Sequence, residues 1–94
     1  LDMFNAYKYL IVEELPKIDS LTFYQKYWLY RMLEIVQVNL DAFHEAYASM
    51  MNAYKIVQQS DFSELEKWDC YLRLGFNAYL MSFIIAFEIL SSLK

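Results

Sequence analysis

The chain has 94 residues with a formal net charge of −4, and 59% of the residues are hydrophobic, including 19% that are aromatic. The length is typical of one domain, so residues 1–94 are treated as a single helical unit. The basic residues are scattered, whereas nucleic-acid binding requires a clustered basic surface, so we expect no nucleic-acid partner. One glycine and one proline leave few turn-forming residues, which favours long helices and an all-α fold.

A first, short helix is predicted over about residues 2–15. Asp2 is a suitable amino-terminal cap. Apolar residues spaced by three and four share one face of this helix: Phe4, Tyr7, Ile11 and Leu15. Pro16 ends the helix, because the residue before a proline is displaced from helical backbone angles.

A second, long helix is predicted over about residues 20–59, where Thr22 with Gln25 fits a capping box. Apolar residues alternate spacings of four and three along it, as in a coiled-coil seam: Leu29, Leu33, Val36, Leu40, Phe43, Tyr47, Met50, Tyr54 and Val57. Polar residues on another side predict a solvated stripe: Glu34, Gln37, Asp41, Glu45, Asn52, Lys55 and Gln59. Because the seam keeps its phase, we predict a continuous helix, with a break capped by Asn39 or Asp41 as the alternative.

A third helix is predicted over about residues 61–93, with Ser60 or Asp61 as its cap. Its apolar residues again form a seam, which we expect to face the core: Leu65, Trp68, Leu72, Phe76, Tyr79, Phe83, Phe87 and Leu90. Its polar residues form a narrow stripe, which we expect to face water: Glu66, Asp69, Arg73, Asn77, Glu88 and Ser91. The similar lengths of the second and third helices predict a long antiparallel hairpin, with the short first helix covering part of it.

The end of the third helix also has the length of a membrane span. Residues 74–93 carry one charge, Glu88, and about 20 residues cross a bilayer. The polar stripe and the shorter uncharged run, residues 74–87, favour a soluble core helix, because a helix in lipid needs no polar face. A single cysteine and the lack of a basic segment before an apolar run favour a cytoplasmic protein. A membrane-associated subunit with a transmembrane helix at about 74–93 is the alternative.

Residues that commonly catalyse reactions or bind metals are isolated in this sequence. Asp41 and His44 have the spacing of half a di-iron site in a four-helix bundle, but the chain has only one histidine. Cys70 is the single cysteine, and the basic Lys67 and Arg73 beside it are offset by neighbouring carboxylates. We therefore predict a protein that is not an enzyme, with no cofactor and no metal site.

Each long helix carries more apolar residues than one seam uses. The residues beside the seams predict an interface: Trp28, Met32, Ile35, Leu74, Met81, Ile85 and Ile89. Because soluble monomers rarely expose apolar patches beyond a few hundred Å², a partner is expected to cover them. We predict a non-enzymatic interaction or structural protein in a homo- or hetero-oligomeric assembly, in which pairing of hairpins completes a helical bundle. A bundle that holds a hydrophobic ligand among its aromatic residues is a third hypothesis.

Overall fold

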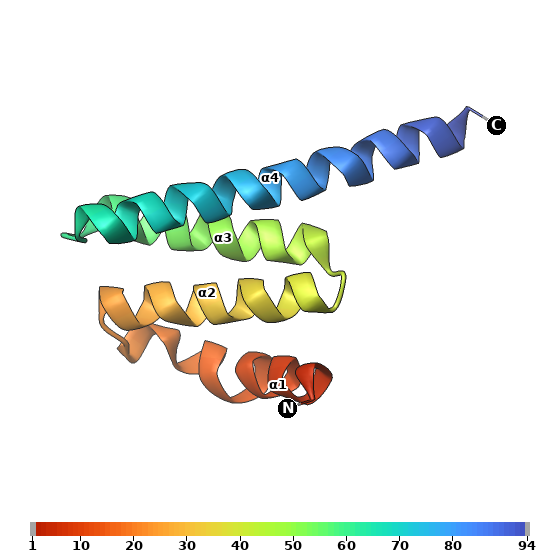
Figure 1. Ribbon diagram of the computed structural model, residues 1–94. Helices are drawn as coiled ribbons and strands as arrows, with labels where there is room; N and C mark the ends of the chain where they lie inside the picture. Colours follow the sequence, from red (N-terminus) through yellow and green to blue (C-terminus); the bar gives the residue numbers. More distant parts are fainter. Residues whose placement is uncertain (1, 94) are drawn as a thin grey trace.

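The computed structural model describes residues 2–93 and confirms the predicted all-α fold. Four α-helices follow one another: α1 (Met3–Tyr9), α2 (Phe23–Asn39), α3 (Phe43–Gln59) and α4 (Glu64–Ser92). They lie in chain order from one side of the molecule to the other, and α2, α3 and α4 are successively antiparallel (Figure 1). The core therefore consists of layers between neighbouring helices and not of one closed bundle centre.

The prediction of one helix over residues 20–59 is wrong, because the chain reverses between α2 and α3. Asp41 has a left-handed backbone with φ 59°, its N–H donates to the Val38 carbonyl (3.1 Å), and the Ala42 N–H donates to the Gln37 carbonyl (2.8 Å). These two bonds form a Schellman motif, which satisfies the last carbonyls of a helix. The alternative break at Asn39–Asp41 is the one that the structure contains.

The apolar seam predicted for residues 29–57 does face the interior, although it is divided between two helices. Leu29, Leu33 and Val36 of α2 form one cluster with Leu10 and residues around α1. A second cluster lies between α2, α3 and α4 and contains Tyr27, Met50, Ala53, Ile56, Val57, Phe62 and Cys70. The seam residues of α2 pack toward α1, and those of α3 pack toward α2 and α4, so regular apolar spacing continues through the turn although the chain reverses there.

The amino-terminal segment is helical beyond α1, but its geometry changes twice. Asp2 caps α1 as predicted, because its carboxylate accepts a hydrogen bond from the Phe4 N–H (2.9 Å). A π-helical turn covers Leu10–Glu14 and a 3₁₀ helix covers Leu15–Ser20. Pro16 stands in the first turn of the 3₁₀ helix, where a missing N–H costs nothing, so the proline changes the helix type and does not begin a loop.

Capping boxes begin both α2 and α4. The predicted box of Thr22 and Gln25 is confirmed, with each side chain bonded to the other residue's backbone N–H. The cap predicted for the third helix is wrong by a few residues, because Ser63 and Glu66 form the box and α4 begins at Glu64. With 29 residues, α4 is ~43 Å long and extends beyond the amino-terminal end of the 17-residue α3 (Figure 1).

Candidate functional site

The orientation of α4 is the reverse of the predicted one. Its polar stripe faces the other helices: Asn77 is buried, and Asp69 and Arg73 are partly covered. The seam predicted to face the core is exposed along its entire length: Leu65, Trp68, Leu72, Phe76, Tyr79, Phe83, Phe87 and Leu90. These eight residues are called the outer seam below. Their expected burial is a wrong prediction, and so is the expected exposure of the polar stripe next to α2.

A buried ionic network between α2 and α4 explains the reversal. Glu34 has an exposed fraction of 0%, although its stripe was predicted to be solvated. Its carboxylate accepts two hydrogen bonds from the Arg73 guanidinium, one of them from Nε at 2.8 Å and the other from Nη2. Arg31 lies 3.3 Å from Asp69 and 3.8 Å from Glu34. The two arginines of the network thus face the two carboxylates, each helix contributing one of each charge.

Hydrogen bonds and burial around this network fix the ionisation of its neighbours. The hydrogen bonds that Arg73 donates to the Glu34 carboxylate raise the pKa of Arg73 above its usual value, so the guanidinium stays charged. Burial raises the pKa of the Cys70 thiol and of the Tyr27 hydroxyl, which donates a 3.4 Å hydrogen bond to Asp69. Both groups are therefore neutral at physiological pH, and a protonated buried thiol is a poor nucleophile.

Aromatic rings lie over both arginines. The Arg31 guanidinium carbon is 5.8 Å from the Trp28 ring centroid, and that of Arg73 is 4.7 Å from the Phe76 ring centroid. Within residues 2–93, no hydrogen-bond acceptor reaches Nε or Nη1 of Arg31, so its charge is balanced by carboxylates and a ring face. Trp28 on α2 and Phe76 on α4 thereby connect the exposed apolar surface to the ionic network.

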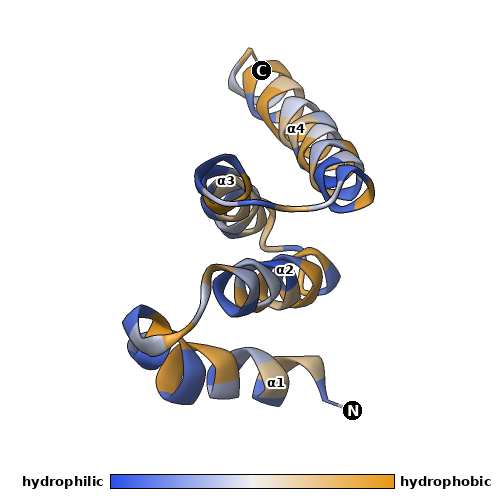
Figure 2. Cartoon of the chain, turned by 90° about the vertical axis from the view of Figure 1, so that its left-hand side faces the viewer, coloured by the Kyte–Doolittle hydropathy of each residue, from blue (hydrophilic) through white to orange (hydrophobic). Residues whose placement is uncertain are grey.

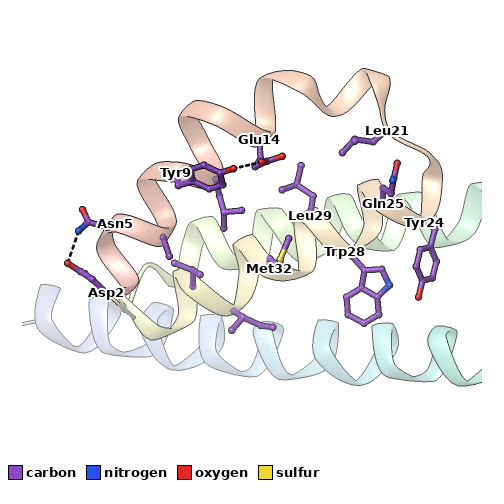
Figure 3. Close-up of a pocket in the computed structure, with 14 residues that line it drawn as sticks. Asp2, Asn5, Tyr9, Glu14, Leu21, Tyr24, Gln25, Trp28, Leu29 and Met32 are labelled. Atoms are coloured by element: carbon purple, nitrogen blue, oxygen red, sulfur yellow. Dashed lines mark hydrogen bonds between the residues drawn. The ribbon is translucent and has the colours of Figure 1, made fainter.

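An apolar groove runs between α1 and α2 (Figure 3). It has a volume of about 1060 Å³, and its wall includes three predicted interface residues, Trp28, Met32 and Ile35. All three remain partly exposed, so the groove is an open trough. Small-molecule sites usually cover most of the ligand surface, so an open trough suits a protein segment better than a hydrophobic ligand.

The other predicted interface residues lie on α4, at two levels of exposure. Leu74 packs against the core cluster beside α3, and Met81 is partly buried. Ile85 and Ile89 are exposed. Sequence reasoning thus selected exposed positions on α2 and on the end of α4 but assigned the outer seam to the core.

Most of the exposed apolar surface belongs to α4. Of the 21 large apolar side chains that are exposed among residues 2–93, 11 are on this helix. Apolar residues occur on several sides of it (Figure 2). By length and composition α4 is a candidate membrane span, and 6% of its most apolar 18-residue window is buried.

No constellation for metal binding occurs among residues 2–93, where no three His, Cys, Asp or Glu side chains converge. His44 is exposed, with Nε2 at 3.9 Å from the Glu88 carboxylate of α4. Cys70 is fully buried in the core between α2 and α4. The structure does not bring His44 and Cys70 together, since His44 lies beside the far end of α4.

The chain matches no protein-family model, and neither a curated protein nor a solved structure is significantly similar to it.

Proposed function

We propose that the protein is a non-enzymatic helical subunit that acts by docking on another protein surface within a homo- or hetero-oligomeric assembly. The outer seam of α4 supports the proposal most directly. Its residues are spaced by three or four, in the order three, four, four, which is the pattern of a helix packed against another helix, yet nothing within residues 2–93 covers them. A single buried thiol fits a reducing compartment, and the proposed location is cytoplasmic.

The groove between α1 and α2 extends the proposed docking surface. Trp28 and Met32 of α2 line this groove (Figure 3). Amphipathic helices commonly bind in grooves of this kind, with apolar residues at every third or fourth position as anchors. Aromatic residues and methionine are enriched in protein interfaces, and Trp28 and Met32 are both exposed in this groove.

A membrane-embedded subunit is the second candidate, because α4 has the length and composition of a span. The contact between α4 and the start of α3 argues against this candidate. His44, in the first turn of α3, is 3.9 Å from Glu88, so a bilayer around residues 74–93 would also surround the start of α3. That region carries the exposed Asp41 and Glu45, and a charge in hydrocarbon costs roughly 3 kcal/mol.

The proposal is tested by the behaviour of the purified protein without detergent. We expect a soluble assembly of at least two chains of 11.3 kDa, or of one chain with its partner, by size exclusion with light scattering at micromolar concentration. A monodisperse monomer that stays monomeric at millimolar concentration would contradict the proposal. Recovery only from the membrane fraction, with detergent required throughout, would support the second candidate instead.

A further inference from the structure

We propose that the outer seam binds a second copy of this chain, and that the two α4 helices pair antiparallel about a twofold axis near Tyr79. This inference rests on the proposed function, because it names the occupant of the same surface. The outer seam is apolar on both sides of Tyr79, so two copies of it can pair with large apolar side chains in contact.

The outer seam is self-complementary around its middle. In an antiparallel pair centred at Tyr79, Phe76 of one copy faces Phe83 of the other, and Leu72 faces Phe87. In the same register Trp68 lies opposite Ser91, one residue beyond Leu90. The two pairs on each side of the twofold axis thus join large apolar side chains, which are exposed in the single chain. Such knobs-into-holes contacts are the basis of helix pairing in coiled coils.

The distribution of charge favours this partner and this direction. Residues 74–87 carry no charge, so between Phe76 and Phe87 the helix has no charged residue beside the outer seam that would select a different chain. The acidic Glu64 and Glu66 stand at the start of α4. A parallel pair would place these carboxylates beside their own copies, whereas an antiparallel pair separates them and aligns the helix dipoles favourably.

The exposed area has the size that a dimer needs. The chain exposes 6395 Å², whereas a folded monomer of its mass exposes about 5700 Å². Two copies together therefore expose about 1,400 Å² more than two compact monomers of this mass would. Specific interfaces bury a similar area, ~1,200–2,000 Å² in total. A C₂ pair uses the same patch on both subunits, so one interface removes the excess from both.

Cross-linking tests the register. Cys70 is replaced by Ala, and two single-cysteine variants, Leu72→Cys and Phe87→Cys, are oxidised separately and as an equimolar mixture, with one carrying a mass tag. The two positions are almost equally exposed, at 70% and 72%, so their thiols have similar access to the oxidant. We expect disulfide-linked heterodimers from the mixture and little linkage within either variant alone.

Substitution by a charged residue tests which face of α4 forms the dimer interface. Phe83→Glu places a carboxylate in the outer seam, and Ile85→Glu, two residues further on, is the matched control on another side of α4. The two side chains are exposed by 58% and 48%, so neither change disturbs the fold, and circular dichroism checks this. We expect Phe83→Glu to raise the dimer dissociation constant by ~30-fold or more, as for an interface hot spot, and Ile85→Glu to change it by less than about threefold.

Three results would overturn the inference. Linkage of Leu72→Cys to its own copy indicates parallel helices, and a larger effect of Ile85→Glu than of Phe83→Glu places the interface on the flank predicted from the sequence. Either result leaves the proposed docking function intact. A monomeric wild-type chain without detergent overturns the self-association, and the proposed function also fails if that monomer stays monomeric at millimolar concentration.

Discussion

Replacing Glu34 by Ala distinguishes the structure from the sequence-based prediction more sharply than any other single substitution. The sequence places Glu34 on a solvated stripe, where removal of a side chain changes the free energy of unfolding by ~0.5 kcal/mol or less. The structure buries it completely, between Arg31 and Arg73. The two descriptions therefore predict different magnitudes for the same experiment.

The expected loss follows from the contacts of the carboxylate. Glu34→Ala removes both hydrogen bonds to Arg73 and leaves two guanidinium groups near one remaining carboxylate, Asp69. Breaking a buried ion pair costs ~3–5 kcal/mol. Because the Arg73 side chain is 30% exposed and can turn toward water, we expect the lower end, ~3 kcal/mol. The free energy of unfolding of small domains is ~5–15 kcal/mol, so we expect the variant to remain folded with clearly reduced stability.

Urea unfolding followed by far-UV circular dichroism measures this loss, at a protein concentration where the assembly state of variant and wild type is the same. Lys55→Ala is the control, because Lys55 belongs to the same predicted stripe and is exposed. A Glu34→Ala variant as stable as the Lys55→Ala control would refute the buried position of Glu34 and the orientation of α2 and α4. The combined Glu34→Leu and Arg73→Met variant adds a second check, because it leaves no unpaired partner and should be ~1–3 kcal/mol more stable than the sum of its single changes predicts.

Two further predictions concern the turn and the buried hydroxyl and thiol. Asp41→Gly should leave the free energy of unfolding unchanged or raise it by up to ~1 kcal/mol, because φ 59° suits glycine. In a continuous helix the same substitution would lower the free energy of unfolding by ~0.3 kcal/mol, so thermal unfolding distinguishes the two by the sign of the change. The pKa values of Cys70 and Tyr27 are raised above their ordinary 9.0 and 10.0, so the folded state retains protons that the unfolded state loses. Stability should therefore be complete below pH ~8 and fall as pH rises from about 9, and Cys70→Ala should reduce the fall between pH ~9 and ~10, measured by urea unfolding at each pH.

Local signals in the sequence predicted the helix starts better than the helix faces. The predictions of the Asp2 cap and of the box of Thr22 and Gln25 were correct because capping depends on residues two or three positions apart. Ser63 with Glu66 has the same form and would have located the start of α4, but Ser60 and Asp61 precede it and were chosen. The turn after α2 gave little signal, because an aspartate occupies the left-handed position where glycine is usual.

The orientation of α4 could not be derived from its own sequence, because it depends on residues about 40 positions earlier. Both a polar and an apolar face are present on the helix, and periodicity does not state which one faces inward. Arg31 and Glu34 decide this by pairing with Asp69 and Arg73. The burial of Arg31 and Glu34 could not be predicted either, because a charged residue on α2 is expected to face water unless its partner is known.

The free energies of the two possible orientations connect the ionic network to assembly. Burying a large apolar side chain contributes ~1.5–3 kcal/mol, and the outer seam holds eight of them. A buried ion pair contributes little net stability, because the desolvation of the charges offsets their attraction. In an isolated chain, an α4 that turned its outer seam inward would therefore gain more than the network supplies. The observed orientation is the favourable one when another surface covers the outer seam, since the apolar burial is then obtained as well as the ion pairs. On this argument the network of Arg31, Glu34, Asp69 and Arg73 serves to direct the outer seam toward a partner, and the stability of the orientation should depend on the partner being bound.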